Sequence, residues 1–411
     1  MIMKKILIIF GLAFAAVSCA RIVTNETKEQ RIGFDTYALR TKAGSSFVGG
    51  STTTTSNIAE GASFGVFAYF HPKNTTTGAA GKWDNTNVAN NLSNMLLNEQ
   101  VTRVQPSAGT YAYTYSNTRY WPRSEYDRIS FFAYYPYAAN AFVENSQDDD
   151  TGITLRAPGD AFVPYSSNPY GFPRFRFVVN RDSKKQVDFM ISDMCLNQSK
   201  QAGVLTGSPN DVVKFTFHHM LSQIRVKAVN VEKDNAAVEV SGIEFTFLGV
   251  PESGIVTPRV DPDYLDADGL PVNADGLAPL LFSWTNTNSS NTQFTTDIYE
   301  DDGTEEEKRE AIMLMIPHTF STDPGRDLAE VSFTVTRTDY GDRGEHYTYQ
   351  GRQTVSLAAG GLTGWEPNKI YNYTIRISLR AVEFSVEVQN WPEASTDAII
   401  VDLNNEEEEN T

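Results

Sequence analysis

The sequence predicts an all-β protein with two antiparallel β-sandwich domains in tandem. Apolar and polar residues alternate with a period of two in many segments, so each segment has one apolar and one polar face, as in a half-buried strand. Clusters of Gly, Pro, Asn and Asp separate these segments, which is typical of antiparallel sheets joined by turns. Aromatic residues make up 12% of the chain, and they favour strands. Clear examples of the alternation are residues 243–247, 331–335, 371–379 and 382–388.

Helical periodicity is scarce along the chain. Short helices are predicted only at residues 87–100 and 305–312. The second segment could equally be a charged loop that leads into a strand at 311–316.

The N-terminus has the pattern of an export signal over residues 1–18. Lys4 and Lys5 precede an apolar run at 6–17. A membrane-spanning helix needs about 20 apolar residues, so this run is too short to span. Its length fits the apolar part of a signal peptide, and we expect it to be removed.

The cysteine that follows this signal is expected to carry lipid. Residues 16–19 (AVSC) resemble a lipobox, in which the cysteine thiol receives diacylglycerol and the chain is cut just before it. The alternative is an ordinary secretory signal with a chance cysteine. We expect lipidated Cys19, a flexible tether at 19–31, and a folded part exposed at the surface of the outer membrane. Cys195 then has no partner, so no internal disulfide forms, and we expect it to be a buried apolar residue.

The length and the polar segments define the expected domains. A chain of 411 residues suggests two domains, or three. The segment 206–211 (TGSPND) is the best candidate for a linker. We therefore expect one sandwich at 32–207, a second at 208–404 and an acidic tail at 405–411.

The charge balance argues against nucleic acid as a partner. The chain has 51 acidic and 34 basic residues and a net charge of −17. Phosphate binding needs clustered Lys and Arg, which this balance does not provide.

The sequence lacks the motifs that are typical of several enzyme classes and metal sites. The histidines have no HExxH spacing, and the adjacent His218 and His219 should point to opposite faces of a strand, one in the core and one at the surface. The acidic segment 261–276 does not fit a calcium loop, since Tyr264 would take the first ligand position. No GxSxG, GxxxxGK[ST] or GxGxxG motif occurs. We expect no enzyme activity, cofactor or metal, although carboxylate pairs for glycoside hydrolysis need only spatial proximity and stay open.

Several motifs spread along the chain resemble the fimbrillin-like lipoproteins, the subunits of type V pili, in their Mfa-like branch. His219 and Leu221 stand at the usual places of the family's F-x-H-x-[LM] strand, whereas Ile191-Ser192 departs from the residues that usually follow its D-[LF]-[LM] step. The segments that carry the resemblance are 64–69 (FGVFAY), 121–122 (WP), 129–137 (ISFFAYYPY), 188–190 (DFM), 213–224, 365, 371–373 (YNY) and 388–391.

The resemblance implies two sandwich domains of transthyretin-like topology and assembly with other pilus subunits by strand donation. In such assembly an arginine-specific protease removes an N-terminal segment, and a strand of another subunit fills the gap. The family pattern is shared by stalk, anchor, tip adhesin and non-polymerising surface lipoproteins. The alternative to a role in a fimbrium and in adhesion is therefore a surface lipoprotein that binds glycan or host protein. Sugar stacking on tryptophan is conceivable for that alternative, but core packing is favoured for Trp83, Trp121 and Trp284.

The first strand of the fold is expected at residues 32–39. Phe34 should point inward, Arg31 stands just before the strand, and Arg40 ends it. A cut after Arg40 would remove the whole strand, whereas a cut after Arg31 would remove only the tether. Arg40 is therefore the candidate processing site, and the alternative is that neither arginine is cut.

Overall fold

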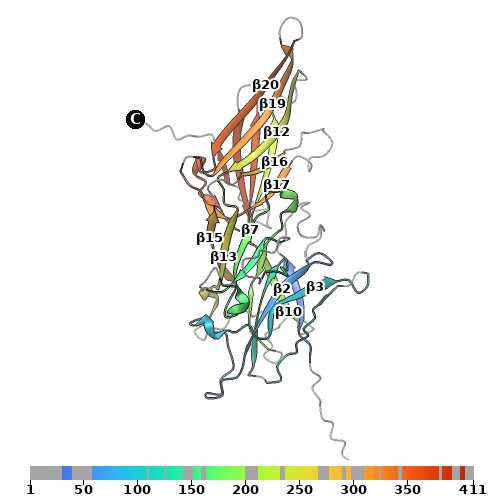
Figure 1. Ribbon diagram of the computed structural model, residues 1–411, viewed down its shortest axis with the longest axis vertical. Helices are drawn as coiled ribbons and strands as arrows, with labels where there is room; N and C mark the ends of the chain where they lie inside the picture. The colour runs from blue at the N-terminus through green and yellow to red at the C-terminus, as the bar shows by residue number, and fades with distance from the viewer. Residues whose placement is uncertain are drawn as a thin grey trace, which may run out of the picture.

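The computed structural model confirms an all-β protein. Within the described residues the regular structure consists of strands and short 3₁₀ turns. The strands form an elongated arrangement, with β2, β3 and β10 at one end, β7, β13 and β15 in the middle, and β12, β16, β19 and β20 at the other end (Figure 1). The structure describes residues 30–38, 58–108, 111–124, 126–141, 151–158, 163–199, 212–231, 237–266, 277–288, 293–297, 310–323, 325–340, 345–378, 382–390 and 399–402.

The first sheet has nine strands and contains most of the N-terminal half. Its strands are β1 Gly33–Ala38, β2 Ser63–His71, β3 Leu96–Val104, β4 Ala112–Thr114, β5 Arg128–Tyr135, β8 Met190–Ser192, β9 Met194–Gln198, β10 Val212–His219 and β14 Leu277–Ala278. The order is β1-β10-β8-β5-β2-β3-β4, with β9 beside β5 and β14 beside β9. β1 runs parallel to β10, whereas the other pairs of this sheet are antiparallel.

A second sheet covers the outer face of the first. Its strands are β6 Ile153–Arg156, β7 Arg174–Val178, β13 Ser253–Val260 and β15 Leu280–Asn288. The order is β15-β13-β7-β6. The ring of Phe175 on β7 lies 6.0 Å from that of Phe132 and 5.1 Å from that of Tyr134 on β5. These contacts join the two sheets through an aromatic layer.

The third and fourth sheets form the other end of the molecule. The third contains β11 Ser222–Asn230, β17 Glu310–Met315, β22 Lys369–Ile377, β23 Val382–Asn390 and β24 Ile399–Asp402, and the fourth contains β12 Val238–Leu248, β16 Gln293–Asp297, β19 Leu328–Tyr340 and β20 Glu345–Ser356. Phe247 of the fourth sheet lies 5.8 Å from Tyr373 of the third, so the sheets pack face to face. The remaining short elements are β18 His318–Thr319, β21 Gly364–Trp365, η1 Val88–Asn90, η2 Tyr165–Ser167, η3 Ser183–Lys185, η4 Pro262–Tyr264 and η6 Ala359–Gly361.

The apolar core has two parts. A smaller cluster fills the inner side of the first sheet and contains Phe34, Phe131 and Phe215. A larger cluster begins on the outer face of that sheet and continues through the second sheet into the space between the third and fourth, where Phe247 lies. The first sheet is therefore apolar on both faces, which explains its continuous runs of buried residues.

Strand pairing crosses the domain boundary that the sequence predicts between residues 207 and 208. β10 pairs with β8, β13 pairs with β7, and β14 pairs with β9. Elements after residue 208 thus complete both sheets of the N-terminal half. The division into 32–207 and 208–404 stays a prediction, and position 208 is not a boundary between sheets.

The helix predicted at 87–100 is wrong. This segment contains the single turn η1 and the first half of β3. Asn98 has a positive φ of 51°, and the register of β3 against β2 shifts between Val66 and Ala68. The apolar residues of the segment are divided between η1, the link to β3 and the first residues of β3, so their helix-like spacing belongs to no single element. For 305–312, the described part begins with β17 at Glu310, in line with the strand alternative.

Candidate functional site

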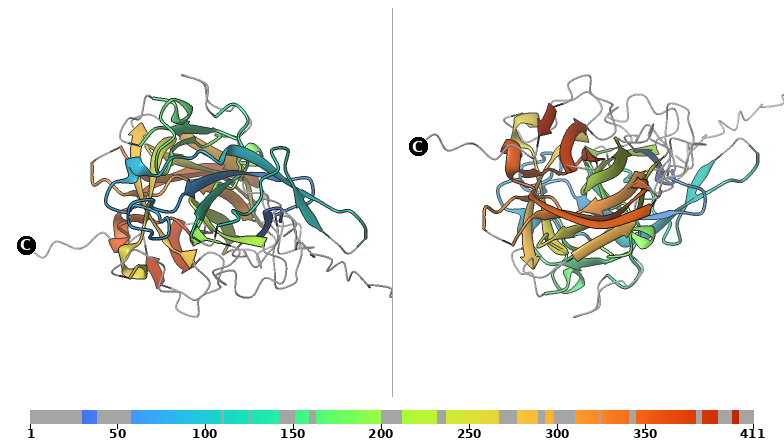
Figure 2. Two further views of the ribbon diagram at one scale, coloured as in Figure 1. Left: turned by 90° about the horizontal axis from the view of Figure 1, so that it is seen from below. Right: turned by 90° about the horizontal axis from the view of Figure 1, so that it is seen from above.

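The first strand, β1, occupies the position that the sequence predicts, and it is drawn in dark blue in Figure 2, left. Its parallel register with β10 runs from Gly33 opposite Val212 to Ala38 opposite Phe217. Phe34 is 5% exposed, so the prediction that it points inward is confirmed. Thr36 on the same face is fully buried, because side chains two residues apart share a face of a strand.

The residues just before β1 are attached to a second part of the chain. The backbone N–H of Trp121 donates to the Gln30 carbonyl at 3.0 Å, and that of Ile32 donates to the Arg119 carbonyl at 2.9 Å. The Tyr115 hydroxyl donates to the Ile32 carbonyl at 2.8 Å. We call this attachment of residues 30–32 to residues 115–121 the N-terminal clip.

β1 and the clip together close the first sheet. β10 lies on one side of β1, and the Tyr113 hydroxyl of β4, the strand at the opposite end of the sheet order, lies 2.6 Å from the Thr36 hydroxyl. The sheet therefore curls until its two ends meet at β1. β1 bridges these ends through its backbone pairing with β10 and its hydroxyl contact with β4.

The side chain of Phe34 fills part of the core enclosed by this curled sheet. Its ring lies 5.2 Å from Tyr115, 5.8 Å from Phe215 and 6.1 Å from Phe131. Aromatic pairs at such separations add to the free energy of area burial, and removing a buried Phe side chain costs about 3–5 kcal/mol. Loss of β1 would leave this aromatic box open to water.

Charged groups lie on the outer side of β1. Asp35 stands opposite Lys214 in the parallel register. Burial raises the pKa of the Asp35 carboxyl above its ordinary 3.8, while the Thr36 N–H, Lys214 and Arg103 oppose that rise. Burial also raises the pKa of the Tyr113 hydroxyl to about 12. Keeping the Asp35 carboxylate charged in this partly buried position therefore costs free energy. The stability of β1 should for that reason depend on pH.

Of the two arginines that flank the strand, only Arg31 lies within the described residues. Arg31 is exposed and forms an isolated β-bridge with Tyr120, and its guanidinium lies 4.7 Å from the centre of the Tyr115 ring. Ile32, on the other side of the Arg31 peptide bond, is fully buried. Arg40 lies outside the described residues, as does the lipidation candidate Cys19.

The remaining residues singled out in the sequence are packed within the fold. Cys195 is buried, as expected, and its thiol donates to the Lys214 carbonyl at 3.3 Å. His219 is buried and binds Asp188 at 2.8 Å, whereas the half-buried His218 binds Asp193 at 2.9 Å, which confirms that the pair separates into core and surface. Trp83 and Trp121 are buried and Trp284 is half-buried.

Acidic and histidine side chains do not converge on one point. Among the described residues no group of three or more His, Cys, Asp or Glu could hold a metal ion. The described start of the acidic segment is a short capped turn, in which the Asp261 carboxylate accepts from the Asp263 N–H at 3.1 Å. No helix in the described part is long and apolar enough to cross a membrane.

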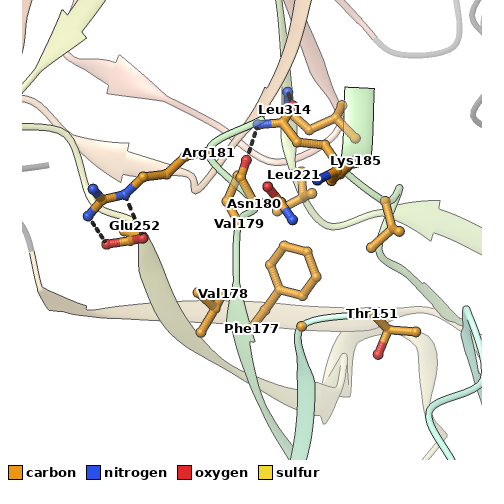
Figure 3. Close-up of a pocket in the computed structure, with 13 residues that line it drawn as sticks. Thr151, Phe177, Val178, Val179, Asn180, Arg181, Lys185, Leu221, Glu252 and Leu314 are labelled. Carbon is orange, nitrogen blue, oxygen red and sulfur yellow. Dashed lines mark hydrogen bonds and ion pairs between the residues drawn. The ribbon is translucent and has the colours of Figure 1, made fainter. Parts of the chain in front are cut away.

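A cavity of about 350 Å³ lies where the second sheet meets the third (Figure 3). At its edge Arg181 donates two hydrogen bonds to Glu252, both 2.9 Å, and this contact raises the pKa of the guanidinium. The buried Gln186 donates to the Asn180 carbonyl at 3.0 Å and accepts from the Leu314 N–H at 2.6 Å. The Gln186–Leu314 bond crosses the junction to β17, whereas the Arg181–Glu252 pair lies on the side of the second sheet.

The fimbrillin-like family model matches residues 51–391, which is most of the chain. The chain belongs to the fimbrillin-like family. The expected resemblance is thereby confirmed.

Individual relatives show how far the likeness extends. Fimbrium subunit Fim1C of Phocaeicola vulgatus is 31% identical over 203 residues, which are 49% of this chain and 44% of that protein. The match thus spans less than half the length of this curated relative. Among solved structures, a candidate cell adhesion protein of Bacteroides uniformis is 15% identical, with 88% of this chain and 98% of that chain covered and a TM-score of 0.42. The tip fimbrial protein Mfa3 of Porphyromonas gingivalis is 12% identical, with 87% and 100% covered and a TM-score of 0.32.

Two of the fimbrillin-like motifs meet in space. Asp188 begins the D-F-M step, His219 lies in the F-x-H-x strand motif, and their side chains form the buried pair at 2.8 Å. The N-terminal clip, in contrast, was not foreseen. The alternation of Tyr111, Tyr113 and Tyr115 could have indicated a strand there, but no sequence signal names residues 30–32 as its neighbour.

Proposed function

We propose that this protein is a cell-surface fimbrial subunit or accessory component in which β1 is exchanged for a strand donated by another subunit. The position of β1 carries this proposal. It is a short N-terminal strand that closes the first sheet and covers an aromatic core. Its removal would expose the edge of β10 and an apolar groove, which an added strand can repair by backbone pairing.

The position of the cut follows from the clip. The Arg31–Ile32 bond lies between the Gln30 carbonyl and the Ile32 N–H, both of which pair with residues 119–121. A protease must bind its substrate as a free extended segment, so this bond is protected while β1 is in place. A cut after Arg40 would instead separate β1 and residues 30–32, the N-terminal side of the clip, from the rest of the chain.

Replacing each arginine tests the processing step. In Arg40→Ala we expect the surface protein to keep its N-terminal segment and to lose the ladder of SDS-resistant oligomers in native cells. The matched variant Arg31→Ala should behave as the wild type, whose mature chain should start at Thr41. A wild-type chain that begins at Cys19 or Ile32 on every molecule would refute strand exchange and favour the non-polymerising surface lipoprotein that binds glycan or host protein.

The proposal includes a lipid anchor at Cys19 that holds the precursor at the outer membrane until the cut after Arg40. Each buried methylene of an acyl chain contributes about 0.8 kcal/mol to membrane binding. Cys19→Ala should therefore abolish incorporation of a palmitate analogue in metabolic labelling, with Cys195→Ala as the control that keeps the label. Persistent label in Cys19→Ala would contradict the anchor without bearing on strand exchange.

A further inference from the structure

An open hollow lies beside the N-terminal clip, on the side of residues 119–124. Its volume is about 620 Å³, within the range of roughly 300–1,000 Å³ that small-molecule sites occupy. Its walls come from the end of β2, from the segment that leads into β3, and from the loop after β4. The cavity at the sheet junction differs, because the polar groups described there bind each other.

The surface of the hollow is partly apolar. The Tyr120 side chain is 45% exposed, and Phe70, Met95 and Pro122 are half-buried beside it. An exposed aromatic ring next to other apolar groups gives a flat surface for a ligand that has an apolar face of its own.

Planar polar side chains surround this surface and are already held in place. The Arg119 Nε–H donates to the Met95 carbonyl at 2.8 Å. One oxygen of Asp127 accepts from the Lys73 N–H at 2.8 Å, and the Asn94 side-chain oxygen accepts from the Phe70 N–H at 3.1 Å. Each group uses one atom for the backbone, which leaves guanidinium and amide donors and a carboxylate acceptor for a ligand. Because these side chains are fixed beforehand, binding costs little ordering entropy.

We propose that this hollow binds a neutral saccharide. A pyranose ring has an apolar C–H face that fits the ring of Tyr120 and a rim of hydroxyls that both donate and accept hydrogen bonds. The hollow offers an apolar surface together with hydrogen-bond donors and acceptors. A purely apolar ligand would leave the polar groups of the hollow unpaired. The Asp127 carboxylate lies in the lining with Arg119 and Arg123, so the hollow offers an acceptor beside its donors, which suits hydroxyl groups.

This site shares Arg119 and Tyr120 with the N-terminal clip, so it rests on the N-terminal segment of the proposed function being in place. The clip binds the backbone of residues 119–121, while the proposed ligand contacts the side chains of Tyr120 and Arg119. The saccharide proposal is therefore made for the chain that keeps β1 and the clip.

Binding to a defined panel tests the proposal. A chain that keeps residues 30–40 is passed over immobilised di- and trisaccharides that end in galactose, mannose, fucose or N-acetylglucosamine, with sialylated forms as acidic comparators. We expect at least one neutral saccharide to bind. Tyr120→Ala should weaken it about tenfold and Tyr120→Phe should retain it, because the ring supplies the contact.

Matched variants separate this result from a general effect on the fold. Tyr349 is 49% exposed on β20 at the other end of the molecule, so Tyr349→Ala should bind as the wild type does. Asp127→Asn keeps the acceptor for Lys73 and should also weaken binding if the carboxylate accepts a sugar hydroxyl. No binding to any neutral saccharide, binding to sialylated forms alone, or unchanged binding by both Tyr120→Ala and Asp127→Asn would overturn the proposal.

Discussion

At the scale of single residues, burial and hydrogen bonding decide the direction in which a carboxyl pKa shifts. Asp35 and Asp84 have opposite shifts of their carboxyl pKa although both accept backbone hydrogen bonds. Burial raises the pKa of Asp35, whereas the Thr86, Asn87 and Asn90 donors lower that of Asp84 to about 2. The balance between desolvation and hydrogen bonding, and not the residue type, sets the direction.

The Asp35 shift predicts a pH-dependent stability. A carboxyl whose folded pKa lies above its unfolded value stabilises the fold fully below the unfolded pKa, and this contribution is lost as pH rises through the folded pKa. Asp35→Asn removes the buried charge and keeps an acceptor for the Thr36 N–H, so the variant should be more stable than the wild type at neutral pH. In urea unfolding from pH 3 to 8, the difference should grow upward from the ordinary pKa of 3.8.

Asp84→Asn serves as the control of opposite sign. The lowered folded pKa of Asp84 stabilises the fold above the unfolded pKa, and this contribution is lost as pH falls through about 2. The variant should be less stable than the wild type at neutral pH. A gain from Asp35→Asn that is the same at every pH would show that desolvation of the carboxylate is not its cause.

At the scale of elements, β10 shows how alternation converts sequence into a sheet. Val213, Phe215 and Phe217 are fully buried on its inner face, while Lys214 and Thr216 on the other face are half-buried. Phe215 and Phe217 therefore share the buried face of the strand. β10 pairs with β1 on one side and β8 on the other, so its inner face belongs to the core that β1 closes.

The two faces of β10 should respond differently to truncation. The Phe217 ring lies 5.7 Å from Phe64 and is fully buried, so Phe217→Ala should cost about 3–5 kcal/mol of the free energy of unfolding. Thr216→Ala on the opposite face should cost much less. Chemical denaturation of both variants measures the contrast, and similar small losses would contradict the assignment of the inner face.

At the scale of the whole molecule, the fold is continuous along its length. The larger apolar cluster runs from the first sheet to the third and fourth, and Gln186 and the Arg181–Glu252 pair add polar contacts at the junction. Two distinct surfaces lie near the N-terminal end: the seam closed by β1 and the hollow beside Tyr120. The same segment, residues 115–121, borders both, so anchoring, assembly and ligand binding are all proposed for one end of the molecule.

The sequence by itself determined the strand content, the inward position of Phe34, the burial of Cys195 and the family. These features depend on the local alternation of apolar and polar residues, on the polarity of single residues, and on motifs that can be recognised in a single sequence. The tertiary structure alone decided that β10 lies beside β1 and that residues 30–32 meet residues 115–121. Those contacts are made mainly by backbone groups far apart in the sequence, and every residue type carries nearly the same backbone groups. Side-chain patterns therefore indicate where a strand runs and which face is buried, but not which strand it pairs with.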